Sequence, residues 1–569
     1  MFQNALLFSA LFFVGCANAP RFAVEAAPEA RALTEATGKK WVISTQGRVA
    51  TDAAEQILRE GGNLIDAAIA ASFAISVERP QSTGIGGGGF MLYREAKSGK
   101  IFAIDFRERA PSGAKEKMYL DSKGEVIPGR SLVGVHAGGV PGLVRGLDEI
   151  HRRFGRKSWK DLLVPAIALA RDGLVVYPYL ANALKDEQGE IRKFSDTRKI
   201  FLKPDGRPFV EGEKIYQPEL AGSLQLISEK RSDGFYKGKI AQAITRATRG
   251  WISEKDLKAY KVRWREPIRT TFRGFEVVSM PPPSSGGTHL IQMLNILEPR
   301  AIEKSGFQSA DALHWIASAM QRAYLDRARY MGDPDWTSVP VNTLISKPYS
   351  DKLRATIDPL RALTSEEIET QQEPIPEHSE TTHFSMMDEE GNMIVSTQTI
   401  NGWFGSKLIP RGTGILLNNE MDDFAAKPGA SNLFGAIGSK ANSVQPGKTP
   451  LSSMSPTLVL EKGKPRLALG APGGTRIITC VFQTILNTLV FNRSLYDSIN
   501  AIRIHQQWKP DILNVEQPGL SPGVEAELVR RGWKIEKKTA GCAVMAVERD
   551  AGRLRGVSEP RDHGKVRAE

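Results

Sequence analysis

The sequence predicts a layered α/β or α+β protein, and two features of the 569-residue chain support this prediction. The first half is dominated by helical patterns, because residues 52–78, 142–260 and 310–331 are rich in helix-forming residues at helical spacing. The second half opens with two alternating segments, residues 382–387 and 393–399, separated by a turn cluster, which predicts a β-hairpin. Strands mixed with pairs of helices are typical of domains in which helices cover a sheet.

Glycine-rich segments mark the boundaries of further elements. Residues 41–50 predict a short strand that ends in a turn. The glycines at 84–89 precede a strand-like segment, FMLY, whereas a phosphate-binding loop would open a helix. This run therefore indicates close backbone packing. The rigid loop at 280–287 precedes a helical pattern from Thr288, and Gly473-Gly474-Thr475 open a helix that is predicted to run to about residue 490.

The composition is that of a soluble globular protein with 25% charged and 41% hydrophobic residues. The length predicts about two to four domain-sized units. The formal net charge of +12 comes from 76 Lys and Arg against 64 Asp and Glu. These charges are scattered, and no basic cluster is interleaved with aromatics, so we expect no nucleic-acid partner. The eight His residues are dispersed without zinc-ligand spacing, so we expect no metal and no cofactor.

The N-terminus resembles an export signal. Residues 5–14 form an apolar run of signal-peptide length that is too short to span a bilayer. Two processing sites compete: Ala17-Asn18-Ala19 has the small-residue form but is followed by Pro20, and Phe13-Val14-Gly15-Cys16 resembles a lipoprotein box. We therefore predict a signal peptide over residues 1–19 and an exported, periplasmic protein, with lipidation at Cys16 as an open alternative.

Three cysteines are present, at positions 16, 480 and 542. If Cys16 is removed or lipidated, two remain, and an oxidising compartment would allow them to pair. Cys480 lies in an apolar helical segment and Cys542 in a segment that predicts a strand. We expect two buried unpaired thiols.

The strongest change in composition lies at residues 364–380. This segment contains six Glu and two Pro, and it has no aromatic, Lys or Arg. Such a segment cannot bury enough apolar surface to order itself, so we predict an exposed, mobile linker. The predicted hairpin begins directly after it.

The linker ends where hydroxyl groups gather. Thr381 and Thr399 are equidistant from residue 390 in the turn, so the hairpin places them opposite one another. Asn401 lies two residues further and faces the same side as Thr399. Attack of the Thr381 hydroxyl on the carbonyl of Glu380 would cut the chain and create an amine with a pKa of about 7.7–8.0, which can act as the base for its own hydroxyl. The alternative is that a Thr pair in a hairpin reflects only β-propensity.

Seven ordered motifs resemble those of the γ-glutamyltransferase family over roughly residues 40–560. They are Gly84–Phe90, Asp105-Phe-Arg-Glu with Ala110-Pro111, Pro282–Gly287, Thr381–Ser385 with Asp388 and Gly391-Asn392, Leu416–Phe424, Pro450–Pro456 and Gly470–Ile478. The resemblance implies an N-terminal-nucleophile hydrolase: a four-layer αββα sandwich formed jointly by a large subunit, 20–380, and a small subunit, 381–569, after self-cleavage between Glu380 and Thr381.

The resemblance also implies a role for each matching residue. Thr381 would be the nucleophile, Thr399 would assist it, and backbone N–H groups at Gly473 and Gly474 would form an oxyanion hole. Arg107 would bind the α-carboxylate of a γ-glutamyl group, because a guanidinium fork matches a carboxylate, and the hydroxyls of Ser452 and Ser453 would add donors. The α-ammonium would be held by Asn401, Glu420 and Asp423.

The implied reaction is transfer of the γ-glutamyl group of glutathione to Thr381 and then to water, an amino acid or a dipeptide. His383 is predicted to pack and hydrogen-bond in its strand. Residues 428–449 resemble a lid loop, in which Phe434 replaces a tyrosine that is common in relatives, and Trp403 is a candidate for reshaping the acceptor side.

Three alternatives stay open at this point. An acylase of the same superfamily would share the Thr381 chemistry without needing an ammonium clamp. An exported solute-binding lipoprotein would show no cleavage. Ser112-Gly-Ala-Lys115 fits the S-x-x-K form of serine acyl-enzymes, but the chain contains no S-D-N or K-T-G partner.

Overall fold

The computed structural model describes residues 28–368, 381–427, 429–430, 432–433, 435, 437–539 and 541–569. The predicted signal peptide, Cys16, Glu380 and Phe434 lie outside these residues, as does most of the predicted linker. Within the described part of the chain, no helix is both long enough and apolar enough to cross a membrane.

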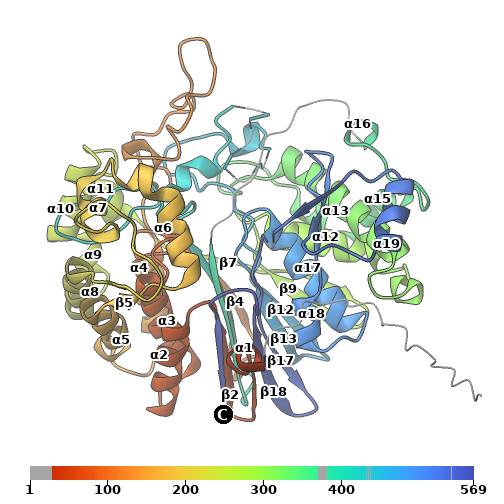
Figure 1. Cartoon of the computed structure of the whole chain (residues 1–569), viewed down its shortest axis with the longest axis horizontal. Coiled ribbons are helices and arrows are strands. Elements are labelled where there is room, and N and C mark those ends of the chain that lie inside the picture. The colour runs from red at the N-terminus through yellow and green to blue at the C-terminus, as the bar shows by residue number, and fades with distance from the viewer. Residues whose placement is uncertain are drawn as a thin grey trace, which may run out of the picture.

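Two seven-stranded antiparallel sheets form the centre of the molecule (Figure 1). From edge to edge, the first sheet contains β19 (Lys565–Ala568), β2 (Trp41–Thr45), β10 (Thr382–Asp388), β11 (Met393–Thr399), β3 (Gly88–Arg94), β4 (Ile101–Asp105) and β7 (Arg263–Arg265). The second contains β1 (Glu35–Gly38), β18 (Arg553–Ser558), β17 (Met545–Asp550), β13 (Lys464–Gly470), β12 (Thr457–Glu461), β9 (Phe275–Ser279) and β8 (Ile268–Phe272). The sheets face each other, because β10 and β11 pack against β13 and β10 packs against β17.

Helices cover the outer faces of both sheets (Figure 1). The first group comprises α2 (Arg48–Arg59), α3 (Leu64–Glu78), α4 (Leu143–Phe154), α5 (Trp159–Asp172), α6 (Pro178–Ile191), α7 (Ser195–Phe201), α8 (Pro218–Lys230), α9 (Asp233–Tyr236), α10 (Gly238–Ala247) and α11 (Glu254–Ala259). The second comprises α12 (Gly286–Leu297), α13 (Ala310–Tyr330), α14 (Val341–Leu344), α15 (Lys347–Ala355), α17 (Arg476–Leu489), α18 (Leu495–Asn500) and α19 (Pro522–Arg530). The predicted α+β class is therefore confirmed.

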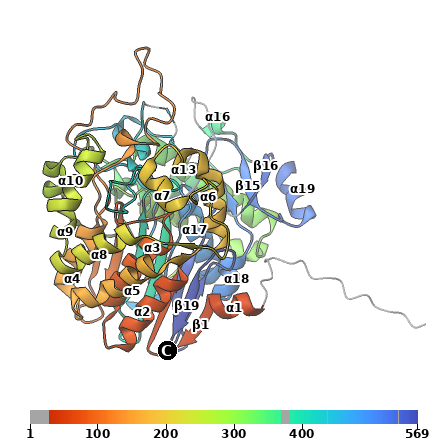
Figure 2. The same cartoon turned by 60° about the vertical axis from the view of Figure 1, so that its left-hand side comes forward.

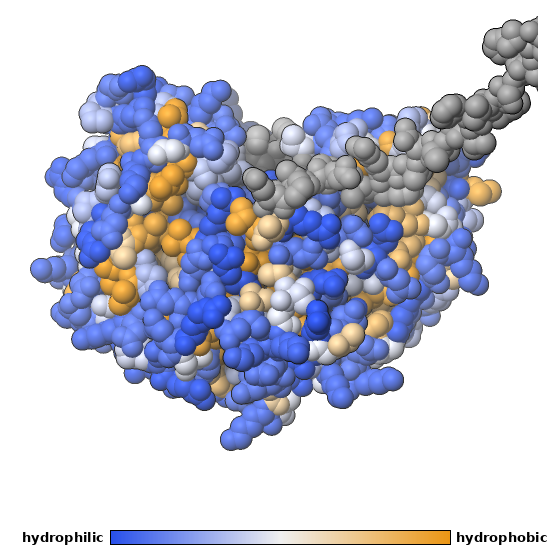
Figure 3. Space-filling view, turned by 60° about the horizontal axis from the view of Figure 1, so that its bottom comes forward, coloured by the Kyte–Doolittle hydropathy of each residue, from blue (hydrophilic) through white to orange (hydrophobic). Residues whose placement is uncertain are grey.

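The smaller elements lie around this centre. A three-stranded sheet of β14 (Ile504–His505), β15 (Leu513–Glu516) and β16 (Ile535–Lys538) lies near α19, on the side of the molecule away from α2 and α5 (Figure 2). A two-stranded sheet is formed by β5 (Leu174–Val175) and β6 (Lys214–Ile215), and α1 (Pro28–Thr34) precedes β1. Viewed from below, the surface is mostly hydrophilic with separate hydrophobic patches (Figure 3).

Helix α3 shows how sequence and packing agree. Asn63 caps its first turn through a reciprocal pair of hydrogen bonds with Asp66, and every residue from Leu64 to Glu78 is buried. Alanine and other compact apolar residues let the helix pack closely on all sides, both against the first sheet and against α2 and α5. The break that the sequence predicts at residues 61–63 lies between α2 and α3.

The hairpin of β10 and β11 has the predicted register. Thr382 lies opposite Gln398, so the next pair outward brings Thr381 opposite Thr399. β11 continues to Thr399, which pairs with Gly88 of β3. β10 begins directly after Thr381, and β11 ends at Thr399, so both threonines lie at the same end of these central strands.

Three predictions about local structure need correction. Cys480 and Cys542 form a disulfide, because the fold brings α17 against the segment that precedes β17. Cys542 lies in that irregular segment and not in a strand. The predicted linker also starts too early: Ser365–Ile368 form the short helix α16, and Ser365 is buried where its hydroxyl donates to the carbonyl of Trp508.

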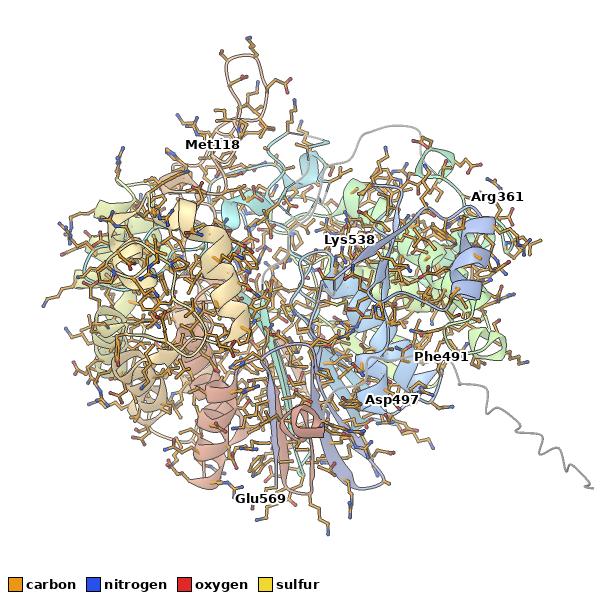
Figure 4. All side chains as sticks on the ribbon, in the orientation of Figure 1. Met118, Arg361, Phe491, Asp497, Lys538 and Glu569 are labelled. Carbon is orange, nitrogen blue, oxygen red and sulfur yellow. A yellow bond between two sulfur atoms is a disulfide. The ribbon has the colours of Figure 1, made fainter. Side chains whose placement is uncertain are left out.

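A long segment at residues 112–134 projects beyond the helices at the top of Figure 1, and Met118 marks it in Figure 4 at the end of the molecule opposite Glu569. Its return side is anchored to the acidic turn at 420–423, because Ser131 Oγ donates to Asp422 Oδ1 at 2.6 Å. The projecting segment is thus tied to a turn that contributes to the candidate site.

Candidate active site

Thr381 and Thr399 lie together in the wall of a cavity of ≈ 310 Å³. Both are buried, with 5% and 3% of their surface exposed. The cavity brings together nearly all of the predicted site residues, which come from segments far apart in the sequence. Its lining consists of Arg107, Arg327, Thr381, Thr399, Asn401, Glu420, Asp423, Asn432, Ser452, Ser453, Met454, Gly474 and Ile477. We call it the first cavity.

Arg107 is held between two carboxylates of the acidic turn. It follows β4, and its backbone N–H donates to Asp105 Oδ1 at 3.1 Å. Its Nη1 lies 2.6 Å from Glu420 Oε1 and its Nη2 lies 2.5 Å from Asp423 Oδ2. The guanidinium is almost fully buried. Arg107 was predicted to bind the carboxylate of the substrate, and Glu420 and Asp423 were predicted to bind its ammonium. The structure places Arg107 in direct contact with both carboxylates.

Three buried carboxyl groups, Glu108, Glu420 and Asp423, interact with Arg107. Burial raises the pKa of Glu420, and Arg107 offsets only part of that effect. Burial likewise raises the pKa of Asp423, and it also raises the pKa of the neighbouring Glu108. The raised pKa values mean that the cost of burying the ionised carboxylates outweighs the attraction of the arginines. A ligand ammonium in the first cavity would supply further positive charge.

A second buried arginine also lines the first cavity, and this residue was not predicted. Arg327 of α13 is buried, and its Nε donates to Ser285 Oγ while its Nη2 donates to Ser453 Oγ, each at 3.0 Å. Burial lowers the pKa of Arg327. Ser285 Oγ in turn donates to the carbonyl of Ser452 at 2.7 Å, which braces the serine pair. Because Ser453 Oγ accepts from Arg327, its own proton is available to a ligand.

A signal for Arg327 does exist in the sequence. The residue follows Ala319 and Ala323 at intervals of four, which places it on the buried stripe of a helix. A charged side chain is rarely buried on such a stripe without a role. Asn432 was also missed: it donates from Nδ2 to Asp423 Oδ1 at 2.7 Å. It belongs to the segment 428–449 that was predicted to be a lid.

The two predicted oxyanion glycines lie directly before α17. Gly473 has φ 135° and Gly474 has φ 53°, conformations that favour glycine. A Cβ on Gly473 would lie only 2.5 Å from the carbonyl oxygen of Gly541, so this position has no room for a side chain. Gly474 lines the first cavity, whereas Gly473 lines a second cavity, of ≈ 480 Å³. Thr381 lines both cavities.

Asn401 lies in a strained turn beside the threonine pair. Its φ is 72°, its backbone N–H donates to Thr399 Oγ1 at 2.8 Å, and its Nδ2 donates to the carbonyl of Asn419 at 3.1 Å. The side chain lines the first cavity. The turn therefore links the hydroxyl of Thr399 to the segment that carries Glu420.

His383 makes the strand contacts that the sequence predicted. Its ring nitrogens bond to Thr397 Oγ1 at 2.8 Å and to Ser385 Oγ at 3.0 Å. Burial lowers its pKa to about 3, so the ring is neutral. By contrast, Ser112 and Lys115 lie in an exposed turn outside the first cavity. The S-x-x-K alternative therefore has no site to support it.

The described residues hold no group of three or more His, Cys, Asp or Glu side chains arranged to bind a metal ion. The first cavity offers hydroxyls, a guanidinium pair and carboxylates. A buried hydroxyl at the start of a strand, close to backbone N–H groups at a helix N-terminus, is an arrangement suited to acyl transfer.

Comparisons with known proteins agree with this class. The model of the family described as Gamma-glutamyltranspeptidase matches residues 50–568, and the chain belongs to that family. Glutathione hydrolase proenzyme of Escherichia coli (strain K12) is 41% identical over 561 residues, which are 98% of this chain and 96% of the relative. The chain is therefore an enzyme, and the solute-binding alternative no longer applies.

Acylases are also close to this chain. Acylase ACY 1 proenzyme of Pseudomonas sp. (strain SE83) is 38% identical over 509 residues, with 88% of each chain covered. The crystal structure of cephalosporin acylase from Bacillus halodurans superposes with a TM-score of 0.83 at 27% identity, covering 98% of this chain and 99% of that one. The fold alone therefore does not choose between the two activities, and the choice depends on the cavity.

Proposed function

We propose that this enzyme is an autoprocessed γ-glutamyltransferase and glutathione hydrolase. The observation that supports this function best is the charge pattern of the first cavity. Glu420 and Asp423 line this cavity together with Arg327 and its hydrogen-bond partner Ser453, and Thr381 lines the same cavity. A γ-glutamyl group carries an ammonium and a carboxylate on one carbon, so it complements both kinds of group at once.

In the proposed reaction, Thr381 Oγ attacks the γ-amide carbonyl of glutathione. The negative charge that develops on the carbonyl oxygen is stabilised by backbone N–H groups of Gly473 and Gly474. The amine of Thr381 takes the hydroxyl proton and passes it to the leaving nitrogen, so that cysteinylglycine departs. Water, an amino acid or a dipeptide then resolves the ester. Thr399 supports the nucleophile through its turn with Asn401.

Recognition of the donor divides between two groups of residues. Glu420, Asp423 and Asn401 hold the α-ammonium, and Ser452 and Ser453 donate hydroxyl hydrogen bonds to the α-carboxylate. Arg107 attracts that carboxylate as well. Its contacts with Glu420 and Asp423 keep the two carboxylates in place, so it positions the ammonium side at the same time.

We also propose that the chain cuts itself between Glu380 and Thr381. The large subunit, 20–380, and the small subunit, 381–569, then remain together as a heterodimer and jointly form a four-layer αββα sandwich. Strands from both subunits alternate within the sheets: β2 lies between β19 and β10, and β9 pairs with β12. Without the cut, the nitrogen of Thr381 is an amide and has no basicity.

We further propose export to the periplasm. The apolar run at residues 5–14 supports a signal peptide, and the disulfide between Cys480 and Cys542 supports an oxidising compartment. Labelling with a radioactive fatty acid, compared between the wild type and Cys16→Ser, tests a lipid anchor. Label in the wild type alone supports lipidation, and no label in either supports release by a signal peptidase.

N-terminal sequencing of the small fragment tests the central proposal. We expect a sequence that begins Thr-Thr-His-Phe. Thr381→Ala is expected to leave the precursor uncut and to lower γ-glutamyl hydrolysis by at least about 10³-fold, whereas Thr381→Ser retains a hydroxyl and should mature slowly. An uncut chain that hydrolyses γ-glutamyl amides would refute the mechanism.

Acylase activity is the competing function. Its glutaryl-type substrates lack the α-ammonium and would leave Glu420 and Asp423 without that partner. We therefore expect γ-glutamyl anilide to exceed glutaryl anilide in kcat/KM by at least about 100-fold. A glutaryl anilide that is hydrolysed equally well would favour the acylase.

A further inference from the structure

The segment that contains Cys542 packs directly against one of the two predicted oxyanion glycines. A Cβ on Gly473 would lie 2.5 Å from the carbonyl oxygen of Gly541 and 2.8 Å from Cβ of Cys542, so the two backbones are in close contact. Cys542 also lines the second cavity together with Gly473 and Thr381. The direction in which the Gly473 N–H points therefore depends on where residues 541–542 lie.

Residues 541–542 lie outside regular secondary structure, in the segment between β16 and β17. Arg503 Nη1 donates to the carbonyl oxygen of Cys542 at 3.0 Å. The disulfide to Cys480 of α17 anchors the same segment covalently. Irregular backbone lacks the ladder of hydrogen bonds that fixes a strand, so these anchors set the position of the surface that Gly473 packs against.

The other end of the disulfide lies on the helix that the glycines open. The backbone N–H of Arg476 donates to the carbonyl of Gly473 at 3.0 Å, so the glycines belong to the turn that starts α17. We call residues 473–475 the oxyanion turn. Cys480 lies about one helical turn further along α17. The disulfide therefore holds the oxyanion turn between α17 and residues 541–542.

A small molecule can approach this disulfide. Both cysteines line a third cavity, of ≈ 260 Å³, and Cys542 is only partly buried, although Cys480 is 3% exposed. Arg503 Nη1 lies 2.9 Å from Cys542 Sγ. A guanidinium so close to a sulfur stabilises a thiolate that forms there. Cys542 is therefore the better leaving group when a thiol opens the bond.

We propose that the bond between Cys480 and Cys542 positions the oxyanion turn, and that a low-molecular-weight thiol opens it and thereby slows turnover. This inference rests on the proposed function, because it requires the Gly473 N–H to stabilise the oxyanion. The two cysteines are positioning residues, since they act through Gly473 and not on the substrate.

The exchange consumes two thiols. The first attacks Cys480 Sγ as its thiolate, the bond between the two protein sulfurs breaks, and Cys542 leaves as a thiolate that takes up a proton. The second attacks the small-molecule sulfur of the mixed disulfide, which releases Cys480 as a thiol and forms the oxidised dimer of the small thiol. The protein disulfide gains the two electrons that the small thiols lose. Residues 541–542 then lose their covalent link to α17.

Reduction of the mature wild-type enzyme tests this role, with γ-glutamyl-p-nitroanilide as the donor. Ester formation and ester hydrolysis both pass through an oxyanion, so dithiothreitol is expected to lower kcat about threefold to tenfold and to leave the donor KM unchanged. Iodoacetamide labelling of Cys480 and Cys542 reports that the bond is open, and reoxidation should restore kcat. An unchanged kcat in labelled enzyme would overturn the proposal, and so would cysteines that resist labelling in dithiothreitol.

A double variant separates positioning from stability. Cys480→Ser with Cys542→Ser should show the lowered kcat without dithiothreitol and should not respond to it, well below its melting temperature. Leu528→Ala is the control, because it removes a fully buried side chain of α19 and lowers stability by about 2–5 kcal/mol without touching the oxyanion turn. Its kcat should equal that of the wild type. If the double variant does not fold, the reduced wild type still decides.

A γ-glutamyl boronic acid gives a readout that lost stability would not move. Its boron forms a tetrahedral anion with Thr381 Oγ, so its Ki should rise by the factor by which kcat falls, while the Ki of glutamate stays unchanged. A boronic acid that binds equally well to oxidised and reduced enzyme would overturn the proposal. Failure of the proposed function is distinguishable, because the untreated wild type would then release no p-nitroaniline.

Discussion

The two cavities beside Thr381 differ in how their charges are arranged. In the first, Arg107 and Arg327 line the cavity with Glu420 and Asp423, and burial raises the pKa of both carboxyls. In the second, Glu559 lies between two arginines, and its pKa is lowered. Burial therefore dominates the carboxyls of the first cavity, whereas the arginines dominate the carboxyl of the second. We expect the first cavity to be the one that favours a ligand with an ammonium group.

Removal of a carboxylate from the first cavity should have the largest effect. Asp423→Asn takes away a contact of Arg107 and half of the ammonium clamp, so kcat/KM for γ-glutamyl-p-nitroanilide is expected to fall at least about 100-fold. Glu461→Gln, at the exposed end of β12, is the matched control. A loss below about fivefold would show that Asp423 does not hold the donor.

Arg327 should contribute next. Arg327→Met keeps an unbranched apolar stem and removes the guanidinium with its charge, so the donor KM is expected to rise about 10- to 100-fold, with a smaller change in kcat. The exposed Arg329→Met on the same helix is the control. If Arg327 acts through the hydroxyl of Ser453, the Ser453→Ala and Arg327→Met effects will not add in the double variant. Additive effects, or a change confined to kcat, would contradict this role.

The raised pKa values predict a pH dependence that is specific to the donor. Only ionised Glu420 and Asp423 attract an ammonium, so kcat/KM for γ-glutamyl anilide should rise with pH above about 4.5, up to about tenfold per pH unit for one proton. Glutaryl anilide lacks the ammonium but shares the Thr381 amine. The ratio of the two kcat/KM values should therefore rise with pH above the ordinary range of a carboxyl pKa. A ratio independent of pH would show that these carboxylates do not bind the ammonium of the donor.

The disulfide should have the smallest effect on donor chemistry. It joins α17 to the segment of the second cavity that contains Cys542. Cys480→Ser with Cys542→Ser is expected to lower stability by about 2–4 kcal/mol, measured as a lower melting temperature without reductant. The donor KM should stay unchanged, because neither cysteine lines the first cavity. A raised donor KM would mean that the disulfide supports the first cavity.

Local patterns were enough to predict the hairpin and the threonine pair. Alternation and the turn at residues 388–392 set the register, and this register brings Thr381 opposite Thr399. The family motifs predicted most of the lining of the first cavity, because residues such as Arg107, Asp423 and Ser452 stand within those motifs. Strand order could not be predicted, since partners such as β19 and β2 are far apart in the chain. The disulfide and the hydrogen bonds from Arg327 to Ser285 and Ser453 depend on such distant contacts.

The interlaced sheets have a consequence for the processed enzyme. In the first sheet, β2, which precedes residue 380 in the chain, lies between β19 and β10, which follow it. After the peptide bond is cut, neither piece could therefore dissociate without breaking the hydrogen bonds between neighbouring strands. Two differently tagged preparations that are mixed after maturation should therefore exchange no subunits, because the large and small subunits of each molecule stay together.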